Sequence, residues 1–92
     1  MTDEDKLVML KMDLPITTNA YDTRLMQYLR AAEEEIAREG ITLSDTVSDN
    51  ELVIQYAAWK WRNRQTGEAM PRMLRYTLNN RLFSEKMRDA DG

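Results

Sequence analysis

The chain has 92 residues, 42% of them hydrophobic and 32% charged, which indicates one folded domain and excludes a chain that is disordered throughout. Cysteine and histidine are both absent, so disulfides, thiolate or typical zinc sites and a Ser-His-Asp triad are excluded. Residues 1–51 carry 5 basic and 12 acidic side chains, whereas residues 52–92 carry 8 basic and 4 acidic ones, for a net charge of −3. This asymmetry predicts either two differently solvated surfaces or an acidic face that meets a basic face of a neighbouring copy or another partner.

The sequence lacks the features of a signal peptide and of a membrane-spanning segment. The start, MTDEDK, is acidic and lacks the basic lead of a signal peptide. The longest nearly continuous apolar run, residues 52–61, is too short to cross a bilayer. We therefore expect no membrane contact and a cytoplasmic setting. With only three glycines and two prolines, long helices are favoured over a sandwich of many strands.

The first expected helix spans residues 3–13, because Thr2 fits an N-cap with Asp5 three residues on and Pro15 ends the helix. The second spans residues 20–39, with Asn19 as its cap and Gly40 as a left-handed residue after its end. Their apolar stripes comprise Leu7, Leu10 and Leu14 in the first helix, and Leu25, Leu29, Ala32 and Ile36 in the second. A loop over residues 41–48 follows, with Leu43 and Val47 expected beneath it.

The third expected helix begins with a capping box formed by Ser48 and Glu51 and continues to about Gln65. Its first half is apolar nearly all round, which predicts the central element of the fold. Trp59 should be buried, whereas Trp61 is expected to be exposed or to face another subunit.

The fourth helix is expected to begin at Pro71, which suits the first helical position. It carries one apolar stripe of Leu74, Leu78 and Leu82, and a second of Tyr76, Phe83 and Met87. The tail, residues 88–92, is expected to be flexible. Together these elements predict one all-α domain over residues 1–92, a compact four-helix fold.

Arginines cluster around the turn between the last two expected helices. They are Arg62, Arg64, Arg72, Arg75 and Arg81. One interpretation is a helix-turn-helix whose last helix enters a major groove, although the pI of 4.9 and the apolar third helix disfavour it. We favour a protein–protein surface in which these arginines and Trp61 are anchors.

Acidic residues form two groups that merit a test as metal or acid–base sites. The first is the helical run Glu33, Glu34 and Glu35. Adjacent helical side chains point about 100° apart, so these three cannot converge on one ion. The second is the loop group Asp45, Asp49 and Glu51, which lacks the glycine and terminal glutamate of a calcium loop. We expect no catalytic residue, metal or cofactor, and a solvated face for the glutamate run.

Three stretches that cover nearly the whole chain carry a family resemblance. They are LKMDLPITTNAYDTRLMQYLRAAEEEIAREGI, the acidic loop after it, and DNELVIQYAAWKWRNRQTGEAMPRMLRYTLNNRLF. In this order they resemble the small all-helical head-tail connector (adaptor, or head completion) proteins of tailed bacteriophages and prophages. The order of elements carries the resemblance: a short helix, an I-T linker, a long acidic helix, a glycine-led loop, an alanine-aromatic helix ending in arginines, and then MPRMLR and LNNRLF.

The resemblance implies a ring of about a dozen copies that docks on the phage portal protein and offers a platform to the next tail, or stopper, protein. Duplex DNA would pass through the ring without specific binding, and negative charge facing the channel would let it slide. Residues 72–83 would then mediate docking or neighbour contact, and Glu33, Glu34 and Glu35 would face the channel or a neighbour. The protein would reside in the virion, and in the host bacterial cytoplasm during assembly.

Three functions therefore remain open from the sequence. The leading one is a non-enzymatic, ring-forming structural protein of a virion or prophage. The second is a small helix-turn-helix-like DNA-binding regulator that uses the last two helices. The third is a small enzyme that relies on carboxylates alone.

Overall fold

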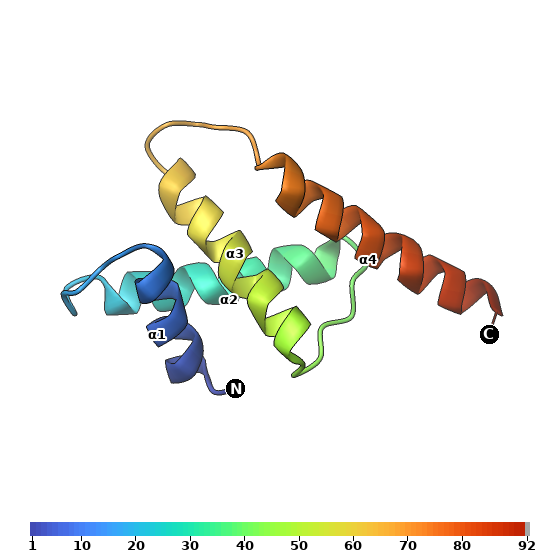
Figure 1. Cartoon of the computed structure of the whole chain (residues 1–92), viewed down its shortest axis with the longest axis horizontal. Helices are drawn as coiled ribbons and strands as arrows, with labels where there is room; N and C mark the ends of the chain where they lie inside the picture. Colours follow the sequence, from blue (N-terminus) through green and yellow to red (C-terminus); the bar gives the residue numbers. More distant parts are fainter. Residues whose placement is uncertain (92) are drawn as a thin grey trace.

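The computed structural model describes the backbone of residues 1–91 and the side chains of residues 1–87, and over that range it contains four helices and no strand (Figure 1). The all-α, four-helix prediction is confirmed. Gly92 and the side chains of residues 88–91, on which the predicted flexible tail falls, lie outside the described residues.

α1 (Asp3–Asp13) begins as its caps predict. The Thr2 hydroxyl accepts a hydrogen bond from the Asp5 amide at 3.1 Å, and the Asp5 carboxylate accepts one from the Thr2 amide at 3.2 Å. The helix ends before Pro15, where the amide of Leu14 still donates to the carbonyl of Leu10. Leu10 is buried on the side that faces α2 and α3, with Leu7 and Leu14 partly buried beside it.

α2 (Asp22–Arg38) starts two residues later than predicted, and Asn19 is not its cap. The reason is that the Asn19 side-chain oxygen accepts a hydrogen bond from the Lys11 ammonium at 2.9 Å, which ties the linker to α1 instead. The other end lies one residue before the predicted Glu39, and the predicted left-handed Gly40 is confirmed, since its φ of 105° is in a region that side chains disfavour. The predicted stripe of α2 is confirmed, because Leu25, Leu29, Ala32 and Ile36 are all buried.

α3 (Val47–Asn63) contradicts the predicted capping box of Ser48 and Glu51. Its N-cap is Thr46, whose hydroxyl accepts a hydrogen bond from the Asp49 amide at 3.1 Å. The helix therefore opens one residue before Ser48, and Glu51 accepts a hydrogen bond from Gln55 instead. Val47, expected beneath the loop, is 84% exposed because it occupies the outer side of this first turn. The helix ends at Asn63, two residues before the predicted Gln65.

The core forms where α3 crosses α2, with α1 packed against both helices on one side and α4 (Arg72–Asp91) on the other (Figure 1). α3 contacts all three other helices, as its apolar surface predicts. Fifteen residues form one buried cluster: Leu10, Leu25, Leu29, Ala32, Ile36, Ile41, Leu52, Val53, Ile54, Tyr56, Ala57, Ala58, Trp61, Leu74 and Leu78.

Both tryptophans differ from the positions expected of them. Trp61 is buried, with its ring edge-on to Tyr21 at 5.5 Å and to Tyr28 at 5.6 Å between centroids. Trp59 is only partly buried and packs edge-on against Tyr56. The prediction that Trp61 is an exposed or subunit-facing ring is therefore wrong, because the start of α2 covers it.

α4 begins at Arg72, so Pro71 stands just before the helix and not at its first position. The amide of Arg75 nevertheless donates to the Pro71 carbonyl at 3.1 Å. Leu74 and Leu78 are buried, with Leu82 partly buried next to Gly40. The helix thus lies with one side against α3 and the loop after α2, and its other side faces solvent.

Candidate interaction surfaces

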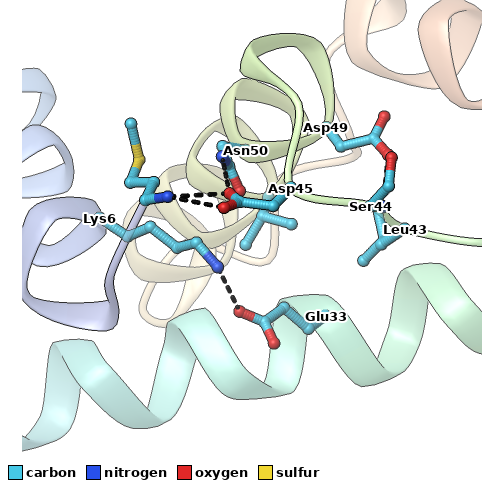
Figure 2. Close-up of a pocket in the computed structure, with 9 residues that line it drawn as sticks. Lys6, Glu33, Leu43, Ser44, Asp45, Asp49 and Asn50 are labelled. Atoms are coloured by element: carbon cyan, nitrogen blue, oxygen red, sulfur yellow. Dashed lines mark hydrogen bonds and ion pairs between the residues drawn. The ribbon is translucent and has the colours of Figure 1, made fainter.

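A hollow of about 300 Å³ lies between α1, α2 and the start of α3, and its charged groups other than Asp49 are paired with one another (Figure 2). The terminal ammonium of Met1 contacts both carboxylate oxygens of Asp45, at 2.9 and 2.8 Å. The Asn50 amide donates to the same carboxylate at 2.8 Å, and the Lys6 ammonium donates to Glu33 at 3.2 Å. The hydrogen bond from Asn50, followed by the ammonium, holds the pKa of Asp45 below its usual value. The hydrogen bonds and ion pairs that line this hollow connect the start of α1 to the loop after α2 and to α2 itself.

Asp49 and Arg81 fasten α4 to the same loop. The Asp49 carboxylate is buried and accepts hydrogen bonds from the Ser44 amide at 2.7 Å, from the Ser44 hydroxyl at 3.0 Å and from the Arg81 guanidinium. Burial alone would raise the pKa of Asp49, but the bonds from Arg81 and Ser44 outweigh it and lower the pKa. Arg81 also donates to the carbonyl of Thr42 at 3.2 Å and contacts Glu85 at 3.5 Å.

A second ion pair joins α4 to the end of α2. The Arg75 guanidinium donates to Glu39 at 2.6 Å, one helix turn beyond Glu35, which accepts from Lys60 at 2.9 Å. Tyr56 lies beside these carboxylates, and burial together with Glu35 and Glu39 raises the pKa of its phenol to about 12. Three ion pairs between the acidic and basic halves of the sequence therefore form within one chain: Lys60–Glu35, Arg75–Glu39 and Arg81–Asp49.

The remaining three arginines of the predicted cluster each have a different environment. Arg62 donates to the carbonyl of Asp13 at 3.0 Å, at the end of α1. The Arg64 guanidinium stacks 3.6 Å above the centre of the Trp61 ring and donates to the Trp61 carbonyl. Arg72 is exposed at the start of α4, and among the described residues no ion pair engages it. The structure thus does not gather the five arginines into one patch.

The glutamate run diverges as the helix geometry requires. Glu33 reaches Lys6 on α1, and Glu35 reaches Lys60 on α3. Glu34 points to solvent with 74% of its side chain exposed and lies 3.9 Å from Arg38 one turn later. Over the described residues, no group of three or more carboxylates is arranged to hold a metal ion.

α4 has a conspicuous apolar stripe on the side opposite its buried leucines. Met73, Tyr76, Phe83 and Met87 are 75, 62, 66 and 52% exposed. Their spacings of three, seven and four residues place them on one side of a helix. The sequence reveals this second strip, but it does not reveal that the strip is left uncovered. We name these four residues the α4 stripe.

α1 has a smaller apolar face, which the sequence analysis missed. Val8, Met9 and Met12 are 57, 39 and 69% exposed and lie opposite the buried Leu10. A shallow hollow of about 360 Å³ continues this surface onto the linker, where Pro15 and Ile16 help to line it. The spacing of 8, 9 and 12 was the available signal. We name Val8, Met9 and Met12 the α1 face.

Comparisons with known proteins do not add a relative: no family model, no curated protein and no solved structure matches the chain. Among the described residues, none of the helices is long and apolar enough to span a membrane.

Proposed function

We propose that this chain is a non-catalytic structural subunit of a tailed-phage or prophage virion, which assembles into a ring between the portal protein and the next tail protein. The ring would extend the DNA channel. The observation that carries this proposal is the exposed α4 stripe, four large apolar side chains on a helix that already buries its other side. Apolar surface of this kind marks contact with another protein. The order of sequence elements shared with head-tail connectors supplies the identity of the assembly.

The charges support a channel role for the acidic part of the chain. Glu33 and Glu35 form ion pairs with Lys6 and Lys60, whereas the Glu34 carboxylate is exposed to solvent. Glu34 is therefore the member of the run that would face the channel or a neighbour. A surface with a net negative charge does not hold the phosphate backbone, so duplex DNA would pass without being bound.

The DNA-binding regulator is less well supported by the arrangement of the last two helices. Residues 64–71 connect α3 to α4, whereas the turn of a helix-turn-helix has about three or four residues. Arg75 and Arg81 point to carboxylates of the same chain, and the outer side of α4 presents apolar residues where a recognition helix presents polar ones. These features favour a protein contact over a DNA contact.

The test is the solution mass by light scattering across protein concentration, at low and high salt, with and without duplex DNA. The proposal expects a mass that rises with concentration toward a ring, without any DNA requirement. It also expects no affinity for duplex DNA at physiological salt. A single subunit or dimer at every concentration that changes mass only when DNA is added would overturn the proposal in favour of the regulator.

A further inference from the structure

The α4 stripe and the α1 face are separate surfaces on two different helices. Figure 1 shows α1 and α4 separated by the crossed pair of α2 and α3. Each buries its inner side against that pair and leaves its outer side uncovered. The two surfaces approach each other only at one end, where Met73 of α4 and Asp13 of α1 line a shared hollow of about 350 Å³. Contact between two different surfaces of a subunit joins copies head to tail, which produces a ring when the rotation closes.

Charges beside the two surfaces are of opposite sign. Arg72 and Lys86 are exposed along one edge of the α4 stripe, since they are fourteen residues apart and positions recur on the same side of a helix about every seven residues. Exposed Glu4, Asp5 and Asp13 surround the α1 face. Lys11 also lines the hollow beside this face, but its ammonium is paired with Asp22 at 2.8 Å. Contact between two α4 stripes would bring the basic edges together, and contact between two α1 faces would bring the acidic groups together. A contact between unlike surfaces pairs them instead, which favours that arrangement over a two-fold one.

The shapes of the surfaces also correspond. The α4 stripe presents two exposed aromatic rings, Tyr76 and Phe83. The α1 face ends in the hollow of about 360 Å³ beside Pro15 and Ile16, which has room for one such ring. Aromatic side chains seated in a pocket contribute most to binding at protein interfaces.

We infer that the α4 stripe of one copy packs on the α1 face of the next copy, with Arg72 and Lys86 toward Glu4 and Asp13 of that neighbour. The inference rests on the proposed self-assembly and names the two surfaces that carry it. The inference also gives a role to charged side chains that form no ion pair within the chain, such as Arg72. Salt should weaken the contact because exposed charges are screened.

Chemical cross-linking tests the contact directly, since the chain has no cysteine of its own. One batch carries Met12→Cys and a second carries Phe83→Cys, and the mixture is treated with a short bismaleimide. The matched control replaces Met12→Cys with Ala37→Cys, at an exposed position of α2 that belongs to neither surface. We expect the mixed Met12→Cys and Phe83→Cys pair to cross-link about tenfold more than the control pair, because docking raises the local thiol concentration.

Two results of this experiment overturn the inference. One is a mixed pair that cross-links no more than the Ala37→Cys control. The other is Phe83→Cys alone cross-linking as efficiently as the mixture, which identifies a two-fold contact between α4 helices. If the mass still rises with concentration in either case, self-assembly stands and only the assignment of surfaces fails.

Charge exchange provides a second, independent test. Variant A carries Glu4→Lys and Asp13→Lys, and variant B carries Arg72→Glu and Lys86→Glu. Each alone opposes like charges across every contact and should associate about tenfold more weakly than the parent chain. An equal mixture restores opposite charges at every contact of an alternating ring and should recover the parent mass. A mixture that associates no better than A or B alone contradicts the inference, provided that thermal unfolding shows both variants folded.

Discussion

The ion pair between Asp49 and Arg81 makes the sharpest prediction about stability. The Asp49 side chain is 3% exposed and that of Arg81 is 29% exposed. Replacement of Arg81 by methionine leaves a buried carboxylate with only the two hydrogen bonds from Ser44. Loss of one partner from a fully buried pair costs about 3–5 kcal/mol, and the partial solvent access of Arg81 reduces our expectation to about 2–3 kcal/mol.

The measurement is urea unfolding of Arg81→Met, Asp49→Asn and the double variant, at concentrations low enough to keep the chain monomeric. At about 4–8 °C per kcal/mol for a domain of this size, Arg81→Met should also lower the melting temperature by about 10–20 °C. The double variant should be less destabilised than the sum of the two single ones, because the stranded charge is then absent. Hydrogen exchange should show the first loss of protection in α4.

Arg38→Met is the matched control, since Arg38 is 75% exposed and its pair with Glu34 spans 3.9 Å on the surface. It should change the free energy of unfolding by less than about 0.5 kcal/mol. If Arg81→Met costs no more than Arg38→Met, the buried pair does not hold α4 in place and the reasoning is refuted.

Three further predictions concern acid, core packing and the turn after α2. Folding lowers the pKa of the Asp49 carboxyl from its ordinary value of 3.8, so the stability that this group contributes is complete above pH 3.8 and is lost as the pH falls through the folded pKa. The urea concentration at the unfolding midpoint should therefore decrease at acid pH, and it should decrease less in Asp49→Asn. Leu29→Ala should cost about 3 kcal/mol by denaturant unfolding, because the side chain is 1% exposed, and a cost below about 1 kcal/mol would contradict the packing described. Gly40→Ala should destabilise by more than about 1 kcal/mol, since φ is 105° and the new methyl group would lie 3.0 Å from Leu82 Cδ1. Gly67→Ala, with φ of 66° and open space around it, should cost less, and equal melting temperatures for the two variants would refute this.

Helix identity was readable from the sequence because it depends on local signals. The stripe from Leu25 to Ile36 repeats at the helical period, and it is buried as predicted. Thr2 with Asp5, and Gly40 after α2, act within a few residues of chain, so their roles were predicted correctly.

Side-chain competition explains the boundaries that were wrong. Asn19 and Asp49 each have a partner outside their own helix turn: Lys11 lies eight residues from Asn19, and Arg81 lies 32 residues from Asp49. Asn19 is thereby taken from the cap it was expected to form. Asp49 lies three residues after Thr46, and its carboxylate is buried against Ser44 and α4. A capping pattern read along the chain does not include these partners.

The fate of the arginines and tryptophans likewise depended on contacts between helices. Trp61 is buried only because the start of α2 crosses the end of α3, which no periodicity within α3 records. Arg75 and Arg81 became internal for the same reason, once α4 lay beside Glu39 and Asp49.

The sequence alone thus determined the class of the fold, the four helices and the leucine stripes that join them, since these follow from hydrophobic periodicity and local hydrogen bonding. Only the tertiary structure decided which charges are neutralised inside the chain and which apolar side chains stay uncovered. Both depend on how the helices cross, because a side chain such as Phe83 has the same local environment in the sequence whether or not another helix covers it.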